Sequence, residues 1–451
     1  MFKKIELWIL YLTIFLGLIF TIGFGFLVRQ ELVGSTKLGW ASKTALFLSE
    51  IPSNAIKLFS QNKTYVEDRH KNLKQGFNIY QSNEINGPKY LLLSRWDADS
   101  NDGIVELVDI HEFKVLHVWN PNISEFYKNF DSKNKLLDDL SFSIPESRFQ
   151  TFSPVLANGI LYFHGNQTPI LGLDSDSNVV KVFDDYFHHS LELTYDNFLW
   201  TTNVSCPISN KIIKDNDCES IRDENIIKLD LEGNVVYEKN ITDLLHEHDI
   251  NVFKNHDVNI DITHVNDVQP INVASKYWNR ETDVFISLRS LDFVFLYDTE
   301  NNSIKWITSL LSGLKNQHDV NVVSNEEISI FNNNILYEMK DGKKSRTVDG
   351  YSNMITYNFN DSSYDFIHEE SFKEYQIKTL SSGRGEITKT GNMLIEESNY
   401  GRLVYLDLQG NKIWEYYNKA NNGKVGRVTW HNLITEDYEI IQVENFLKTG
   451  K

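Results

Sequence analysis

One pattern recurs along the 451-residue chain and constrains its fold more than any other feature. Each copy holds a hydrophobic strand, a second strand that ends in Asp, a tight Gly/Asn turn, and a third strand that often ends in an aromatic residue. The clearest copy, 391–416, places Asp407, a Gly410-Asn411 turn and Trp414 in this order. Short hydrophobic runs separated by such turns predict antiparallel hairpins.

The same features return at intervals typical of a propeller blade. The Asp, turn and aromatic positions of two further copies are Asp298, Asn301, Asn302 and Trp306, and Asp230, Gly233, Asn234 and Tyr237. Weaker copies occupy 90–119 and 159–183, and a divergent copy runs from 326 to about 368. The repeats predict an all-β protein with the fold of a six-bladed β-propeller. The segment Arg427–Thr435 is expected to close the ring against the first blade. A pair of β-sandwiches explains the repeated ending less well.

An apolar segment precedes the repeats. Leu7–Val28 is almost uninterrupted in its apolar residues and long enough to cross a bilayer as a helix. No small-residue cleavage site follows it, which favours an uncleaved signal anchor, a single transmembrane helix. Lys3 and Lys4 before the segment outweigh Arg29 after it, which favours a cytoplasmic N-terminus. The rest of the chain is then expected outside the cytoplasm, in the periplasm of a Gram-negative cell.

Three regions follow from these features. Residues 1–30 are expected to be the membrane anchor, 31–85 a linker with short helices, and 86–451 the β-propeller domain. Within the linker, the pattern from Leu38 to about Ser60 predicts one or two short helices broken at Pro52.

The charge balance excludes one class of function. The formal net charge is −18 and the sequence pI about 5.2, so the chain lacks the basic surface that nucleic-acid phosphates require. An anionic substrate would need a locally positive pocket. Cys206 and Cys218 lie in one polar loop, and in an exported domain such a pair predicts a disulfide; two free thiols would instead fit a cytoplasmic domain.

Three histidines precede strands in similar contexts. They are His189 before L-E-L, His264 before V-N-D-V and His318 before D-V-N-V. In a propeller, residues just before the innermost strands face the central channel at one end, so equivalent positions converge. A single such histidine is more often structural, but three, joined by Asn266 and Arg289, favour a shared site. Imidazole, amide and guanidinium donors together suit an oxyanion with several oxygens.

These segments resemble a known family. Several motifs are similar to those of the bacterial arylsulfotransferases, the PAPS-independent aryl-sulfate sulfotransferases. They are the histidine segments, S-L-R at 287–289, Q-H-D at 317–319, and G-N-M-L-I followed by G-R-L-V-Y and W-E-Y. The resemblance covers roughly Tyr90–Tyr416. It implies a six-bladed propeller outside the cytoplasm that moves a sulfuryl group from one phenol to another without a metal.

The resemblance also assigns roles to residues. It implies that His318 is the transiently sulfated catalytic residue, and that the substrate sulfate is bound by His189, His264, Asn266 and Arg289. Two positions depart from the family pattern. Ser190 stands where an aspartate often follows the early histidine pair, and Gly385, beside Arg384, replaces a threonine in the last blade.

The residue types fit this chemistry on their own terms. Sulfuryl transfer, like phosphoryl transfer, depends mainly on positioning and charge stabilisation. A neutral nitrogen of His318 would attack sulfur, which gives a sulfohistidine and ping-pong kinetics. His264 or His189 then binds sulfate oxygens as a cation or protonates the leaving phenolate. Because phenols have a pKa of about 10, exchange between them is nearly balanced and needs no activated nucleotide.

The expected partners are therefore an aryl sulfate donor, a phenolic acceptor and the inner membrane, with a homodimer as one assembly to consider and no cofactor. Two alternatives remain open at this point. His189, His264 and His318 are also a three-histidine set of the kind that binds zinc, although Arg289 would repel a metal ion. The second alternative is a membrane-anchored propeller that serves as a binding or assembly platform without catalysis.

Overall fold

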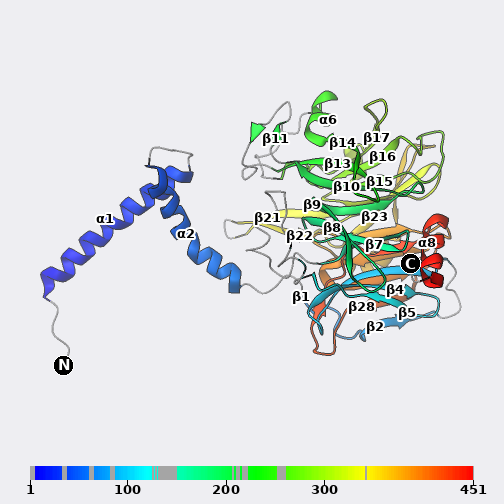
Figure 1. The fold of residues 1–451 in the computed structure, drawn as a ribbon, viewed down its shortest axis with the longest axis horizontal. Coiled ribbons are helices and arrows are strands. Elements are labelled where there is room, and N and C mark those ends of the chain that lie inside the picture. Colours follow the sequence, from blue (N-terminus) through cyan, green and yellow to red (C-terminus); the bar gives the residue numbers. More distant parts are fainter. Residues whose placement is uncertain are drawn as a thin grey trace. The chain divides into compact units, whose positions relative to one another are not determined.

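The computed structural model of the protein describes residues 6–32, 38–59, 65–81, 87–123, 126, 130, 150–205, 208–209, 214–215, 222–250, 261–340 and 343–449. The chain forms two compact units, Met1–Asn62 and Lys63–Lys451 (Figure 1). The expected disulfide falls outside this set, because Cys206 and Cys218 are not among the described residues.

The first unit contains the apolar segment. Helix α1 spans Leu7–Leu32, and its segment Leu7–Gln30 is long and apolar enough to cross a membrane by length and composition. Its side chains are largely exposed within the unit, as expected of a helix whose apolar surface is covered by something other than its own chain. Such a helix is a membrane anchor or a signal sequence.

The second helix of this unit corrects one expectation. Helix α2 runs without interruption over Gly39–Phe59, so the predicted break at Pro52 is wrong. Proline removes one backbone hydrogen bond and crowds the carbonyl four residues earlier, but a helix often accommodates this as a kink.

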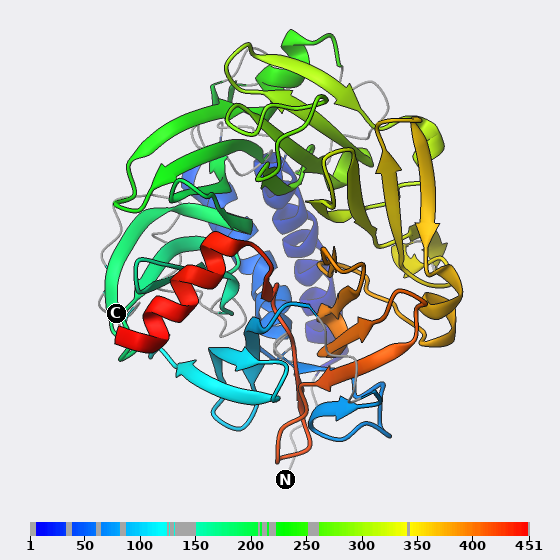
Figure 2. The same ribbon diagram turned by 90° about the vertical axis from the view of Figure 1, so that its right-hand side faces the viewer.

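The second unit is built from antiparallel sheets that follow one another around a common centre, an all-β, propeller-like arrangement (Figure 2). One four-stranded sheet has the order β30-β3-β4-β5, with β30 Asn432–Ile434, β3 Tyr90–Asp97, β4 Asp102–Asp109 and β5 Lys114–Trp119. A seven-stranded sheet has the order β14-β13-β10-β9-β8-β7-β6, with β6 Phe152–Ala157, β7 Ile160–His164, β8 Thr168–Leu173, β9 Val179–Leu193, β10 Phe198–Ser205, β13 Asp223–Asp230 and β14 Val235–Asn240.

Three further sheets complete the arrangement. Two are four-stranded: β15 Val265–Pro270, β16 Asp283–Leu288, β17 Phe293–Asp298 and β18 Ser303–Ile307, and β19 His318–Val322, β20 Glu327–Asn332, β23 Asn353–Asn358 and β24 Ser363–Ile367. The five-stranded sheet has β2 Gly76–Ile79, β28 Lys412–Tyr417, β27 Arg402–Leu406, β26 Met393–Glu397 and β25 Arg384–Ile387.

Short elements decorate these sheets. Three two-stranded pairs are β1 Tyr65–Val66 with β29 Val425–Gly426, β11 Ile208–Ser209 with β12 Lys214–Asp215, and β21 Ile335–Lys340 with β22 Lys343–Val348. The helices are α6 Ile241–Glu247, α7 Glu369–Glu374 and α8 Asp437–Thr449, and the 3₁₀ turns are η3 Arg289–Leu291, η4 Leu310–Ser312 and η5 Ser398–Tyr400.

The repeated Asp closes its turn by local hydrogen bonds. The Oδ1 atom of Asp407 accepts from the backbone N–H groups of Gln409 and Asn411 at 2.9 and 2.8 Å. Asp230 makes the same bonds to Glu232 and Asn234, each at 2.9 Å. The Asp therefore recurs because a short carboxylate satisfies the backbone N–H donors that a tight turn leaves unpaired.

The aromatic end of the repeat fills the space between strands. Trp414 is fully buried, stacks on Tyr405 at a ring distance of 5.2 Å and meets the ring of Phe77 at 5.3 Å. A buried indole contributes more apolar area than most side chains, which explains its use where neighbouring sheets pack.

The ends of the second unit join its sheets. As predicted for Arg427–Thr435, β30 pairs antiparallel with β3, so a C-terminal strand adjoins the first strands of the unit. Strand β2 pairs with β28 and β1 with β29, so part of the segment expected to be a linker joins the sheets.

Candidate active site

The structure brings the three predicted histidines together at one end of the inner strands. The ring of His189 lies 4.8 Å from the ring of His264 and 6.3 Å from that of His318. His318 begins β19, His264 directly precedes β15, and His189 lies in the second half of β9. Three separate strands thus supply one cluster, which we call the histidine cluster.

Unusual backbone conformations aim two of these side chains. His189 and His264 have φ angles of 62° and 48°, in the left-handed region that non-glycine residues rarely adopt. Such a conformation costs about 1–3 kcal/mol per residue and persists only where the surroundings enforce it. The His189 carbonyl is held by Ser153 Oγ at 2.8 Å and His164 Nε2 at 3.1 Å.

The hydrogen bonds of Asn333 define the proton position on His318. Asn333 Nδ2 donates to the carbonyls of Thr379 and Ser382 at 3.1 and 2.8 Å, so its Oδ1 atom faces His318. This oxygen lies 2.5 Å from His318 Nδ1 and can only accept a hydrogen bond. The proton of neutral His318 is therefore on Nδ1, and Nε2 carries a free lone pair.

Burial keeps His318 neutral. Its side chain is 2 % exposed, and this burial, together with Arg289, holds the pKa of His318 well below its ordinary value. Burial and the neighbouring His264 likewise hold the pKa of His189 well below its ordinary value. Neutral imidazoles are nucleophiles and hydrogen-bond acceptors, which protonated ones are not.

Arg289 supplies the fixed cation of the cluster. It begins η3, and its Nη1 atom lies 3.3 Å from His264 Nε2. The guanidinium is mostly buried, and among the described residues its buried Nε has no acceptor. A buried donor on a cation is costly to leave unpaired, so this N–H is suited to an anion from outside the chain.

His264 is paired with a carboxylate. Its Nδ1 atom is hydrogen-bonded to Asp261 Oδ2. Burial raises the pKa of Asp261, but His264 and Arg222 outweigh burial and lower it to about 2. The pKa of His264 is lowered because burial outweighs Asp261. Asp261 stays ionised and would stabilise a proton that His264 takes up during a reaction.

Asn266 is buried at the same end, but part of it is engaged. Its Nδ2 atom donates to the carbonyl of Gln317 at 2.7 Å. Gln317 in turn donates to Ser287 Oγ and to the carbonyls of Leu288 and Phe293, at 3.0–3.1 Å. Asn266 therefore fixes the chain directly before His318, and its second amide N–H remains for other contacts.

A second histidine and a glutamate, both missed in the sequence, lie behind His189. His188 Nδ1 is 2.7 Å from His189 Nδ1, and His188 Nε2 is 3.4 Å from Glu224 Oε1. Burial raises the pKa of Glu224 to about 8, and Asp261 adds to this rise. Of the two, only His188 had a sequence signal, as the first residue of the H-H pair.

Trp430 forms a further wall that sequence analysis missed. Its ring lies 5.9 Å from His189 and 6.2 Å from His318. It comes two residues before β30 and so lies near the start of an inner strand, as His264 and His318 do. Applying the same positional rule to the closing segment would have found it.

The two departures from the family pattern lie outside the histidine contacts. Ser190 Oγ accepts from the Val268 N–H at 3.0 Å and so joins two inner strands. At Gly385, a Cβ atom would come within 2.1 Å of Met354 Cε, so glycine fits the packing there. Arg384 binds Asp319 Oδ1 at 2.7 Å and Glu192 Oε1 at 3.0 Å.

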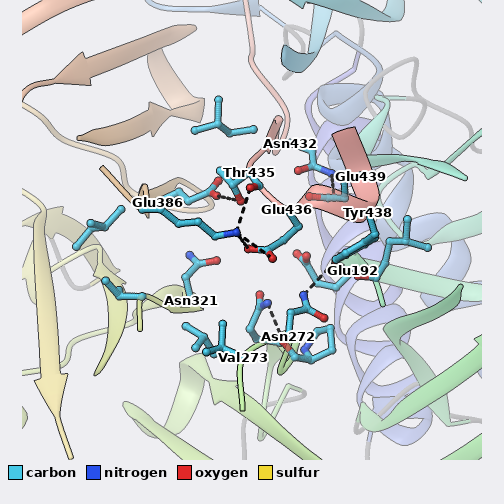
Figure 3. A pocket seen from close by; sticks show the side chains of 18 of the residues that line it. Glu192, Asn272, Val273, Asn321, Glu386, Asn432, Thr435, Glu436, Tyr438 and Glu439 are labelled. Carbon is cyan, nitrogen blue, oxygen red and sulfur yellow. Dashed lines mark hydrogen bonds and ion pairs between the residues drawn. The ribbon is translucent and has the colours of Figure 1, made fainter. Parts of the chain in front are cut away.

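A pocket with the opposite charge lies at the other end of the inner strands (Figure 3). We call it the acidic pocket; side chains labelled in Figure 3 include Glu192, Asn272, Asn321, Glu386, Glu436, Tyr438 and Glu439. Burial raises the pKa of Glu439 to about 8 and that of Glu386 well above its ordinary value. Arg384 and Lys389 are its basic lining residues.

The ligand geometry bears on the metal hypothesis. Across the described ranges, no three His, Cys, Asp or Glu side chains are arranged to hold a metal ion. The three-histidine zinc set considered from the sequence is therefore not formed in this part of the chain.

Comparisons with known proteins identify one matching family and several distantly similar structures. A family model described as arylsulfotransferase (ASST) matches residues 162–419, more than half of the chain. No curated protein matches. Among solved structures, a protein of unknown function from Bacteroides caccae is 8% identical, with 76% of this chain and 98% of that chain covered and a TM-score of 0.44. A nidogen/laminin complex is 6% identical, with 76% of this chain and 97% of that chain covered and a TM-score of 0.41. The Neurospora crassa Pan2 WD40 domain is 9% identical, with 75% of this chain and 83% of that chain covered and a TM-score of 0.36.

Proposed function

Since this chain belongs to the arylsulfotransferase family, we propose that it moves a sulfuryl group from an aryl sulfate ester to a phenolic acceptor through a sulfohistidine at His318. The family supports sulfotransferase activity in general terms. One observation carries the finer proposal: a neutral histidine, protonated on Nδ1, lies in the same cluster as a buried arginine whose Nε has no acceptor among the described residues.

The cluster suits the sulfate group of the donor. Arg289 offers a permanent cation whose Nε has no acceptor among the described residues, and the second amide N–H of Asn266 is a neutral donor. A fixed cation in a buried site stabilises charge on sulfate oxygens more than it would in water. His189 adds an imidazole beside these groups.

Two balanced steps follow. In the first, the His318 Nε2 lone pair forms a bond to sulfur while the sulfur–oxygen bond to the aryl group breaks, and the phenolate leaves with that electron pair. In the second, the oxygen of an acceptor phenol bonds to sulfur, loses its proton, and the nitrogen–sulfur bond returns its electron pair to Nε2. No nucleotide enters, because one aryl sulfate replaces another.

His264 is the better of the two candidate acid–base groups. Asp261 bonds its Nδ1 atom and would stabilise an imidazolium, as the carboxylate of a catalytic triad does. Its Nε2 atom faces Arg289 and the cluster. We therefore assign to His264 Nε2 the proton that the acceptor phenol loses in the second step and that then passes to solvent, and to His189 a substrate-binding role. The phenolate of the first step leaves unprotonated.

The proposal extends to architecture and location. We count the seven-stranded sheet as two blades that share β9. Together with the other four large sheets, this gives six blades. We further propose that α1 is an uncleaved anchor in the inner membrane and that the propeller faces the periplasm. The support is the apolar α1 and the lysines at positions 3 and 4.

The test uses the full chain in detergent with 4-nitrophenyl sulfate, with and without phenol. We expect phenol to accelerate nitrophenolate release in the wild type, His318→Asn to abolish it, and a chelator to leave it unchanged. His111→Asn, at an exposed position, is the matched control and should behave as the wild type. Absence of release from folded wild-type protein with every phenol tried would refute the proposal and favour the binding-platform alternative.

A further inference from the structure

A hairpin inserted between β20 and β23 lies beside the histidine cluster. Its strands β21 and β22 pair in a regular antiparallel register in which Tyr337 is opposite Arg346 and Ile335 opposite Val348. In Figure 1 the labels of β21 and β22 lie on the side of the sheets opposite α8. The sequence through this turn, Lys340–Arg346, is rich in basic residues.

Tyr337 ties the hairpin to the arginine of the cluster through one residue. Its hydroxyl donates to Asn316 Oδ1 at 2.6 Å. Asn316 Nδ2 donates to the carbonyl of Arg289 at 3.2 Å, and its backbone N–H is bonded to Asp292 Oδ1 at 2.6 Å. The hairpin therefore rests on the residues that hold Arg289.

Arg346 shares the face of the hairpin that is turned to the protein. Opposite residues of an antiparallel pair point to the same face, and residues two apart on one strand do so too. Ile335, 3 % exposed, and Tyr337 both contact the body of the unit through this face. Arg346, the partner of Tyr337, is thus on the side of Arg289.

Electrostatics agree with this placement. Burial lowers the pKa of Arg289, and the charge of Arg346 is the next largest cause. Within the described ranges Arg346 has no carboxylate at salt-bridge distance, although acidic residues outnumber basic ones by 62 to 44 in the chain. An exposed, unpaired cation next to a buried one repels it, and a bound anion relieves that repulsion.

We propose that Arg346, with the ring of Tyr337, forms an outer subsite for a second anionic group on an aromatic substrate. The preferred substrates are then phenols or aryl sulfates that also carry a carboxylate or a further sulfate. The Tyr337 side chain is 48 % exposed, so its ring offers an apolar surface beside the guanidinium. The inference rests on the proposed function, because it places the reacting group in the histidine cluster.

The kinetic test compares two acceptors of similar shape, 4-hydroxybenzoate and the neutral 4-hydroxybenzamide, with 4-nitrophenyl sulfate as donor and the full chain in detergent. The readout is the ratio of their kcat/KM values. Arg346→Gln should lower the ratio about five-fold, the size expected for one partly exposed ion pair, and Arg346→Lys should retain part of the preference. Arg280→Gln, which removes an arginine stacked on Tyr195 elsewhere, is the matched control. An unchanged ratio in Arg346→Gln would overturn the proposal.

A binding test separates this proposal from the activity itself. 4-Sulfobenzoate and benzenesulfonate differ by one carboxylate and need no turnover. Calorimetry should show tighter binding of 4-sulfobenzoate to the wild type, with the difference lost in Arg346→Gln and kept in Arg280→Gln. Equal binding of both compounds by the wild type would refute the subsite. If the two compounds are distinguished but no sulfuryl transfer occurs with any acceptor, the subsite stands and the proposed reaction fails.

Discussion

The two ends of the inner strands carry opposite chemistry on the same scaffold. At the beginning of the strands, neutral imidazoles surround Arg289, and at their other end Glu192, Glu386 and Glu439 line the acidic pocket. Strand β9 carries His189 and, three residues later, Glu192, so residues of both ends are fixed by the same backbone. The charge preference of each end therefore depends on which residue type stands at which end of a strand.

A buried ion-pair network separates the two ends. Arg384 binds Asp319 and Glu192, and its Nη1 atom also donates to the His431 carbonyl at 3.1 Å. Without this cation, two carboxylates would lie buried between the ends. The comparison teaches that a protein of net negative charge can keep a buried arginine among neutral imidazoles when its buried carboxylates are paired with cations or protonated.

The largest expected effect distinguishes the two ends by activity. His318→Asn should lower phenol-dependent release of nitrophenolate on the order of 10³-fold or more, because the covalent step loses its nucleophile. Glu436→Gln, in the acidic pocket, should change it less than about two-fold, since a surface substitution away from the reacting atoms has little effect. An equal loss in both variants would show that the two ends are not functionally separate.

The next effect is on stability and tests the network between the ends. Arg384→Met should lower the free energy of unfolding by about 3–5 kcal/mol, because Asp319 and Glu192 keep buried charges without a partner. Urea denaturation measures this. Adding Asp319→Asn and Glu192→Gln to Arg384→Met should restore part of the loss. A triple variant no more stable than the single one would argue against the ion-pair explanation.

A smaller effect concerns the proton position on His318. Asn333→Ala removes the acceptor that holds the proton on Nδ1, so we expect roughly a 10-fold slower first half-reaction, from the loss of one buried hydrogen bond. Rapid mixing with excess enzyme measures nitrophenolate release in a single turnover. Asn360→Ala, at an exposed turn, is the control and should leave the rate unchanged.

A further effect appears in the pH dependence of stability. The folded-state pKa of Glu439, raised by burial to about 8, exceeds its ordinary value of 4.5. Between these two pKa values the folded protein keeps a proton on Glu439 that the unfolded chain loses. The contribution of protonated Glu439 to the free energy of unfolding is therefore complete below pH 4.5 and is lost as the pH rises through 8. Glu439→Gln should be increasingly more stable than the wild type between these pH values. Glu444→Gln, exposed on the same helix, should show no such trend.

Local interactions made part of the fold predictable from the sequence. The Asp-to-Asn turns are satisfied within five residues, as Asp230 and Asp407 show, so their spacing is visible in the chain. The position of histidines before inner strands was visible for the same reason, and the structure gathers His189, His264 and His318.

Long-range contacts account for what was missed. Glu224 contacts His188 from another strand, which no local pattern indicates, and Asn333 reaches Thr379 and Ser382, which are far away in the sequence. Asp261 is the exception, because it lies only three residues before His264 and was missed although its contact is local. The pairing of 335–340 with 343–348 was not predicted, because cross-strand register follows from folding and not from composition. Pro52 was taken as a helix break, where the helix continues.

The closing strand sets an order of events during synthesis. Strand β30 pairs with β3, and Trp430 directly before it completes the wall around His189 and His318. These residues follow all three histidines in the chain, so a nascent chain already contains the histidines while its ring is still open. The wall around His189 and His318 is then complete only when β30 has paired with β3.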